Sequence, residues 1–264
     1  MLAVVGAMEE EVTLIRDRMA ISSEAVHAGI TVYRGDFDAA DIVLAQCGIG
    51  KVNAAICTQM LIDLYFPTKL IFSGVAGGLM ANMQVGDLIV ASHLIQFDVD
   101  LTAFGRRHGE LPDRDRMIQS DPDLVQKATA AFDEVFDGGT WEGETKPNLM
   151  IGTVVSGDKF VKDSDTLKWL QREFAALATE MEGAAVGYTC QLSDLPCVII
   201  RGLSDTADEN ASDDFKSNLE IVCTHSFALM ENLFRRRVEA LEPQPVFPTV
   251  PRNHHGEEPG VAGI

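Results

Sequence analysis

The segment "LATEMEGAAVGYTC" (residues 177–190) joins a short strand pattern to a helix that is rich in glycine and alanine. The pattern predicts a strand over 177–181 and a helix over 182–192. Two carboxylates, Glu180 and Glu182, lie at the junction on either side of Met181. The small side chains of the helix should let it pack closely against a neighbour, so a charge at this junction must be exposed, compensated or used.

The same alternation of short apolar runs and helical patterns extends over most of the chain. Strands are predicted at residues 2–7, 31–37, 41–47, 69–75, 87–97, 149–157, 177–181 and 197–205. Helices are predicted at residues 9–19, 51–66, 123–136, 165–173, 182–192 and 213–237. This alternation indicates an α/β fold, a single three-layer domain over residues 1–238 with a mixed central sheet flanked by helices. Residues 239–264 are rich in proline and are expected to form a disordered tail.

The composition argues against several classes of function. The formal net charge of −19 over 264 residues would repel nucleic acid. No apolar run is long enough to cross a bilayer, and the N-terminus lacks the basic region of a signal peptide. Five cysteines lie in apolar surroundings without a C-x-x-C pair, as expected for reduced thiols in the cytoplasm. His254 and His255 have no partner ligands nearby in sequence, and we expect neither a metal nor a cofactor.

Two of the predicted strands end in segments that could carry chemistry. In "GAMEEEV" (6–12), three consecutive acids begin a helix, where the helix dipole favours negative charge. Because successive helical residues point about 100° apart, one of these acids must face the sheet, where it could act as a general base. The segment "SGVAGG" (73–78) is either a loop that brings backbone N–H groups to a ligand or a tight turn.

Two further strand ends carry acids. In "TEMEGAA" (179–185), a carboxylate could accept hydrogen bonds from the vicinal hydroxyls of a ribose, or both acids could be ordinary charges at a helix N-terminus. In "RGLSDTADE" (201–209), Asp205 follows the hydroxyl of Ser204 and could act as an acid catalyst. The alternative there is a turn or helix cap with a surface arginine, Arg201.

Seven blocks, in order, resemble one enzyme family. They are "GAMEEE", "CGIGKVNAA", "SGVAGGL", "DVDLTAFG", "VSGDKFV", "TEMEGAA" and "RGLSDTAD". Together they resemble the bacterial methylthioadenosine/S-adenosylhomocysteine nucleosidases, which belong to the nucleoside phosphorylase superfamily. The resemblance covers about residues 1 to 237. It implies a homodimeric hydrolase that releases adenine from small nucleosides, without a metal.

The resemblance also implies catalytic roles. Asp205 would protonate the adenine ring at N7, with Ser204 supporting it. Glu11 would orient or deprotonate the attacking water, with Arg201 in the same network. Protonation turns the purine into a neutral leaving group, while a nearby carboxylate steadies the cationic sugar, which is the division of labour that glycosidic cleavage requires.

The binding roles follow from the same blocks. Glu182 would bind the ribose hydroxyls and Met181 would pack against the sugar. Phe160 would stack on the purine, and the backbone of Val161 would bond to it. The remaining pocket positions would be Met8, Ile49 and Phe215 from the same chain, and Phe104 and Pro112 from the partner subunit.

One position departs from the common family pattern. Many members have G-S-A-G-G where this chain has "GVAGG" (74–78), so Val75 replaces a hydroxyl of the water network. This variant, together with "QFDVDLTAFG" (96–105), resembles the branch that also hydrolyses aminodeoxyfutalosine in menaquinone synthesis. Valine can neither donate nor accept a hydrogen bond, so Glu11 and Arg201, or another group, must hold the water.

Three other functions fit the sequence less well. A phosphate-dependent nucleoside phosphorylase of the same superfamily would place basic residues where this chain has "GAMEEE", and three acids would repel phosphate. A non-catalytic nucleoside-binding protein would have no use for the acid and base at Asp205 and Glu11. A dinucleotide-dependent dehydrogenase would need a G-x-G-x-x-G fingerprint, which the chain lacks.

Overall fold

The computed structural model describes residues 1–38, 40–112, 114–139, 141–143, 145–207 and 211–235. The proposed tail, residues 239–264, lies outside these residues. Within them, no helix combines the length and the apolar character needed to cross a membrane.

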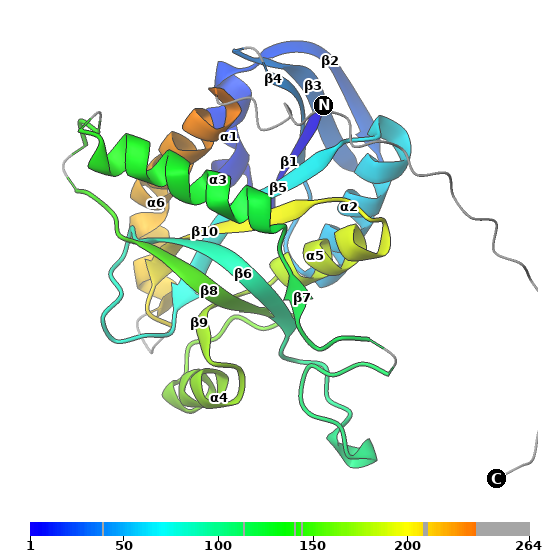
Figure 1. Ribbon diagram of the computed structural model, residues 1–264, viewed down its shortest axis with the longest axis vertical. Coiled ribbons are helices and arrows are strands. Elements are labelled where there is room, and N and C mark those ends of the chain that lie inside the picture. The colour runs from blue at the N-terminus through cyan, green and yellow to red at the C-terminus, as the bar shows by residue number, and fades with distance from the viewer. Residues whose placement is uncertain (39, 113, 140, 144, 208–210, 236–264) are drawn as a thin grey trace, which may run out of the picture.

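The described strands form one mixed sheet (Figure 1). Its strands are β1 Leu2–Gly6, β2 Ala20–His27, β3 Ile30–Phe37, β4 Ala40–Gln46, β5 Lys69–Gly78, β6 Leu88–Gln96, β7 Ile118–Gln119, β8 Leu149–Ser156, β9 Ala176–Glu180 and β10 Cys197–Asp205. Their order is β10-β6-β8-β9-β5-β1-β4-β3-β2, and β7 pairs with β6. Because β10 also pairs with β5, the strands β5, β9, β8, β6 and β10 close on themselves.

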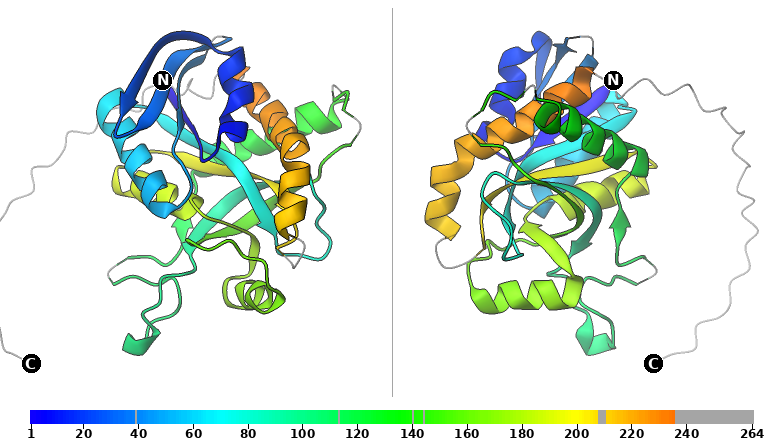
Figure 2. Two further views of the ribbon diagram at one scale, coloured as in Figure 1. Left: turned by 180° about the vertical axis from the view of Figure 1, so that it is seen from behind. Right: turned by 60° about the vertical axis from the view of Figure 1, so that its left-hand side comes forward.

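Helices cover both faces of this sheet, as the alternating pattern predicts. They are α1 Glu9–Arg18, α2 Lys51–Tyr65, α3 Pro122–Phe132, α4 Ser164–Phe174, α5 Gly183–Leu192 and α6 Ala211–Arg235. Figure 2 shows α2 and α5 on one side, with α1, α3 and α6 on the other. Alternate residues of β1 face opposite sides: Ala3 and Val5 belong to the core against α2 and α5, and Leu2 and Val4 to the core against α1, α3 and α6.

Small residues let α5 approach the sheet, as predicted from "GAAVG". Gly183, Ala184 and Ala185 are buried in the first turn of the helix. A Cβ atom on Gly187 would lie 2.5 Å from Cδ1 of Leu94 in β6. A larger residue at position 187 would therefore push the helix, and the strand exit that precedes it, away from the sheet.

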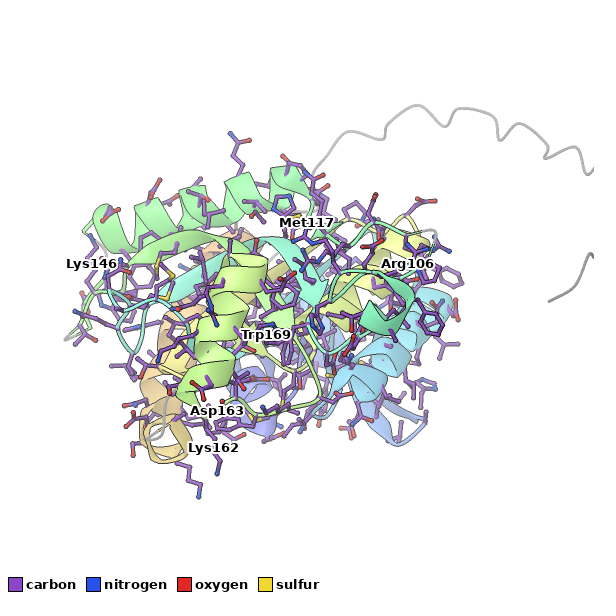
Figure 3. All side chains as sticks on the ribbon, turned by 90° about the horizontal axis from the view of Figure 1, so that it is seen from below. Arg106, Met117, Lys146, Lys162, Asp163 and Trp169 are labelled. Atoms are coloured by element: carbon purple, nitrogen blue, oxygen red, sulfur yellow. The ribbon has the colours of Figure 1, made fainter. Side chains whose placement is uncertain are left out.

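The segment between β6 and β7 is fastened to α4 (Figure 3). The ring of Trp169 in α4 meets the ring of His108 edge to face, with centroids 5.0 Å apart. Arg116 donates a 2.6 Å hydrogen bond to the carboxylate of Glu173. Phe104, in the short helical turn η1 Thr102–Phe104, stays 81% exposed on this segment.

The structure adds the short strand β7, which was not predicted, and corrects the sequence predictions in three further places. Strand β2 was not predicted, because its residues are mostly exposed and show no regular alternation. The helix predicted at 123–136 is α-helical only to Phe132, and a π-helical turn, η2 Asp133–Asp137, follows it. The segment 73–78 is neither a loop nor a tight turn but the last part of the buried strand β5.

Candidate active site

One pocket of about 110 Å³ opens where β1, β5, β9 and β10 end. It brings together eleven of the residues singled out from the sequence: Met8, Glu11, Ile49, Val75, Phe160, Val161, Met181, Glu182, Ser204, Asp205 and Phe215. It is also lined by Ala7, Ala76, Gly77, Lys159, Thr179 and Glu180. The structure does not bring Arg201, Phe104 or Pro112 to the wall of this pocket.

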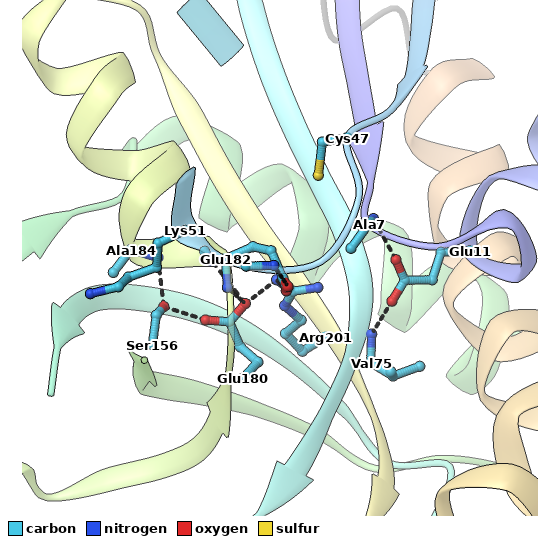
Figure 4. Close-up of polar contacts among 12 residues, drawn as sticks. Ala7, Glu11, Cys47, Lys51, Val75, Ser156, Glu180, Glu182, Ala184 and Arg201 are labelled. Atoms are coloured by element: carbon cyan, nitrogen blue, oxygen red, sulfur yellow. Dashed lines mark hydrogen bonds and ion pairs between the residues drawn. The ribbon is translucent and has the colours of Figure 1, made fainter. Parts of the chain in front are cut away.

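Glu11 is the acid of α1 that faces the sheet, as the helical spacing requires, while Glu9 and Glu10 are exposed. Its Oε2 accepts hydrogen bonds from the backbone N–H groups of Ala7 (2.6 Å) and Met8 (2.9 Å). Its Oε1 accepts one from the N–H of Val75 at 3.0 Å. Three donors from two strand ends therefore fix the carboxylate before any ligand arrives (Figure 4).

Arg201 lies fully buried beneath the pocket, so the alternative of a surface arginine is wrong. Its Nη2 bonds to the carboxylate of Glu180 and lies 3.6 Å from Oε2 of Glu182. Its guanidinium carbon lies 4.4 Å from the centre of the Phe72 ring. Nε and Nη1 have no hydrogen-bond partner among the described residues.

Glycine at position 74 is what allows Arg201 and Glu11 to approach each other. A Cβ atom there would overlap Nη1 of Arg201 and come within 2.7 Å of Oε1 of Glu11. The unpaired Nη1 of the guanidinium and Oε1 of Glu11 therefore both lie next to the place that a side chain at position 74 would occupy.

Glu180 and Glu182 have different surroundings. Glu180 is saturated by protein donors: Arg201, the hydroxyl of Ser156, and the N–H groups of Glu182 (3.0 Å) and Gly183 (2.7 Å). Glu182 receives one hydrogen bond, from the N–H of Gly50 at 2.8 Å. Glu180 thus has the contacts of a structural counter-ion, and Glu182 keeps acceptor capacity for a ligand.

Burial shapes the charge states of this cluster. Burial raises the pKa of Glu11, partly offset by Arg201 and the three N–H donors. Burial and the charge of Glu180 raise the pKa of Glu182 to about 7. Burial opposes the charge on Arg201, but Glu180, Glu182 and Glu11 raise the pKa of its guanidinium. The arginine therefore stays charged, and at neutral pH both the protonated and the ionised form of Glu182 are populated.

Asp205 ends β10 in a fixed orientation. The hydroxyl of Ser204 donates to its Oδ2 at 2.8 Å, and the N–H of Ala207 donates to its Oδ1 at 2.9 Å. The pairing of β10 with β5 shifts register between Leu203 and Asp205. A Cβ atom on Gly77 of β5 would come within 2.9 Å of Oδ1 of Asp205, so this glycine provides room for the carboxyl group.

The rim of the pocket is apolar and partly open. Phe160 is 42% exposed and its ring meets that of Phe215 edge to face at 6.1 Å. Ile49, at 54% exposure, follows the exit of β4. Lys159 and Thr179 also line the pocket but were not predicted as site residues. Lys159 lies in "VSGDKFV" and Thr179 in "TEMEGAA". Their positions next to Phe160 and Glu180 in sequence could have identified them.

Comparison with known proteins defines the class to which this fold and site belong. The sequence pattern of the Phosphorylase superfamily matches residues 1–235. The 5'-methylthioadenosine/S-adenosylhomocysteine nucleosidase of Geobacillus thermodenitrificans is 38% identical over 229 residues, which are 86% of this chain and 93% of that protein. This chain therefore belongs to the 5'-methylthioadenosine/S-adenosylhomocysteine nucleosidase family of the phosphorylase superfamily.

Solved structures agree with this assignment. The nucleosidase of Neisseria meningitidis, in complex with methylthio-immucillin-A, has a TM-score of 0.82 and 35% identity, covering 89% of this chain and 98% of that chain. The futalosine hydrolase of Helicobacter pylori has a TM-score of 0.83 and 33% identity, covering 89% of this chain and 97% of that chain. One protein named for methylthioadenosine and one named for futalosine thus share this fold closely.

Proposed function

We propose that this protein hydrolyses the N-glycosidic bond of adenine nucleosides, with 5'-methylthioadenosine, S-adenosylhomocysteine and aminodeoxyfutalosine as candidate substrates. The observation that carries the proposal is that one pocket holds three differently set carboxylates, Glu11, Glu182 and Asp205, behind an apolar rim. Nucleosidases of the same family, 34–38% identical to this chain, support it. The products are adenine and the free thioribose or its analogue.

In this proposal each carboxylate has one task. Glu11 holds the attacking water and takes its proton, with Arg201 beneath the pocket in the same charge network. Glu182 accepts hydrogen bonds from the ribose hydroxyls and stabilises the positive charge that develops on the sugar. Asp205, oriented by Ser204 and Ala207, delivers the proton that N7 of the adenine receives as the bond breaks.

The remaining pocket residues fit the parts of such a substrate. Phe160 offers a face for stacking on the purine, and the backbone of Val161 offers hydrogen bonds to its edge. Met181 packs against the sugar. Met8, Ile49 and Phe215 surround the substituent at the 5' position, where an apolar alkylthio group gains from burial.

Val75 has a consequence for the attacking water. Its side chain packs with Val222, Cys223 and Phe215, and only its N–H reaches Glu11. We propose that Glu11, with Arg201 beneath it, positions the water without a hydroxyl at position 75. The futalosine hydrolase among the structural relatives supports aminodeoxyfutalosine as an additional substrate.

The rival function, phosphorolysis, is tested by measuring adenine release with and without inorganic phosphate. We expect the same rate in both, because Arg201 is already neutralised by Glu180 and the carboxylates around it repel a dianion. The sugar product should carry a free hydroxyl at C1. A strict requirement for phosphate, or a sugar 1-phosphate product, contradicts the proposal.

The raised pKa of Glu182 predicts a pH dependence of KM. Ribose hydroxyls donate to the ionised carboxylate, so a proton competes with substrate below the pKa of about 7. KM should rise about tenfold between pH 8 and pH 6, since the ionised fraction of a group with this pKa falls about tenfold. Initial rates at varied nucleoside concentration measure this effect.

The variant Glu182→Gln provides the comparison, since its KM should be higher and nearly constant over the same pH range. An unchanged pH dependence in this variant would assign the titration to another group.

The same pKa shift makes the protein less stable, not more, as the pH rises. The folded chain binds this proton more tightly than the unfolded chain does, so the contribution of Glu182 to stability decreases as the pH rises from 4.5 to about 7.

We further propose that the protein is a cytoplasmic homodimer. The five cysteines are all free and buried, as suits a reducing compartment. An apolar surface on α2, formed by Val52, Ile56 and Leu64, is exposed in the single chain, and so is Phe104. A second copy would cover this surface, and Phe104 and Pro112 would then contribute to the pocket of the partner.

A further inference from the structure

Beside the pocket, three residues from distant parts of the chain form a closed ring of hydrogen bonds, which we call the Lys51–Asp98–Asp158 ring. The backbone N–H of Lys51 donates to Oδ1 of Asp158 at 2.8 Å. The backbone N–H of Asp158 donates to Oδ2 of Asp98 at 3.0 Å. Nζ of Lys51 donates to Oδ1 of Asp98 at 2.6 Å, and also to Gln96 at 3.2 Å.

The ring joins the two halves of the proposed binding site. Gly50, next to Lys51, donates the hydrogen bond that Glu182 receives from the protein, and Asp158 supplies the acceptor for the adjacent N–H at the start of α2. Phe160 and Val161 follow Asp158 by two and three residues and line the pocket. The ring therefore connects the loop that contacts Glu182, the proposed ribose-binding group, to Phe160 and Val161, the proposed purine-binding residues.

We propose that the Lys51–Asp98–Asp158 ring is a positioning device that sets the purine-binding segment 158–161 at a fixed distance from Glu182. The proposal rests on the proposed function, because it assigns Phe160 and Val161 to the purine. None of the three residues lines the pocket, so each acts through its neighbours. Among the described residues, the hydrogen bond from the Lys51 N–H is the only one that ties Asp158, in the segment between β8 and α4, to α2.

The ring contributes orientation more than stability. The side chains of Lys51 and Asp98 are 16% and 30% exposed, and ion pairs this close to solvent add little to the free energy of folding. A charge-assisted ring, however, restrains two backbone N–H groups and a lysine side chain in one arrangement. Opening it should cost binding energy for adenine, because the bound purine would then have to order the segment itself.

The test uses Lys51→Met, Asp158→Ala and the double variant, compared by kcat, KM and the Kd of adenine measured by calorimetry. We expect each single variant to raise KM and the adenine Kd about tenfold, with kcat changed less than about threefold. The double variant should be no worse than the more affected single variant, because one opening releases the whole ring. Additive effects in the double variant would overturn the ring as a unit.

Two further variants separate positioning from general damage. Asp158→Asn keeps an oxygen for the N–H of Lys51 and should restore adenine affinity to near the wild-type value. Lys127→Met removes a comparable lysine–aspartate pair, 2.8 Å from Asp123 on α3, and should change neither KM nor the adenine Kd. If Asp158→Asn is as impaired as Asp158→Ala, or if all variants lose thermal stability in parallel with affinity, the positioning role is wrong.

The outcome is distinguishable from a failure of the proposed function. If the wild-type protein releases no adenine from any nucleoside yet binds adenine, the hydrolase proposal fails and the calorimetric comparison still tests the ring. If the wild-type protein hydrolyses nucleosides and the ring variants bind adenine normally, the ring proposal fails alone.

Discussion

Replacing Asp205 with asparagine is expected to lower kcat/KM for nucleoside hydrolysis about a thousandfold, within the range that a general acid contributes. The amide can accept the hydrogen bond from Ser204 or Ala207 but has no acidic proton to deliver to N7 of the leaving purine. Because Asp205 is held from both sides, the variant side chain should stay in place and the pocket should still bind nucleoside. Single-turnover adenine release measures the chemical step directly.

The control for this variant is Asp36→Asn, an exposed aspartate on β3 that should leave activity and thermal stability unchanged. Binding of substrate to Asp205→Asn, measured by calorimetry, shows that the fold and the pocket persist. Hydrolysis within tenfold of the wild-type rate would remove Asp205 from the role of acid and leave the leaving-group proton to solvent or to another residue.

Glu11→Gln is expected to abolish most of the activity because it removes the proposed base. The same variant should also destabilise the protein. Both oxygens of Glu11 accept backbone N–H groups, so either orientation of the glutamine amide directs an NH2 group at a donor. We expect a drop in kcat/KM of about a thousandfold and a loss of unfolding free energy of about 1–3 kcal/mol, typical for a buried donor left without its acceptor.

Its matched control is Glu10→Gln, the neighbouring residue on the same turn of α1, which is exposed. That variant should keep wild-type kcat/KM and lose at most a few tenths of a kcal/mol from the helix dipole. Equilibrium denaturation and initial rates distinguish the two effects. If Glu11→Gln is fully stable and active, the carboxylate is neither the base nor an anchored acceptor.

Sequence patterns predicted the parts of this molecule that depend on local order. The strand at residues 2–7 is a continuous apolar run because β1 is buried on both faces, and the glycine and alanine of α5 signal its close approach to β6. Strand β2 escaped prediction because pairing with β3 stabilises it while both faces stay mostly exposed. Backbone hydrogen bonds do not require apolar side chains, so this strand has no alternating pattern that could predict it.

The site could be predicted only in part for a similar reason. The blocks around Glu11, Glu182 and Asp205 each lie at a strand end and stand out in the sequence. The burial of Arg201 does not, because its partner Glu180 comes from another strand and the two meet only after the sheet closes. The Lys51–Asp98–Asp158 ring spans 107 residues of chain between Lys51 and Asp158, and no local pattern links its members.

Gly74 restricts how the pocket can change over evolution or by design. A methyl group at position 74 would overlap Arg201 and crowd Glu11, so this position beneath the pocket accepts only glycine. Ile49, on the exposed rim where the 5' substituent is proposed to lie, has no such limit. Variants that accept larger or differently charged 5' substituents should therefore carry substitutions on the rim. Glycine at position 74 should be kept in every variant that retains catalysis.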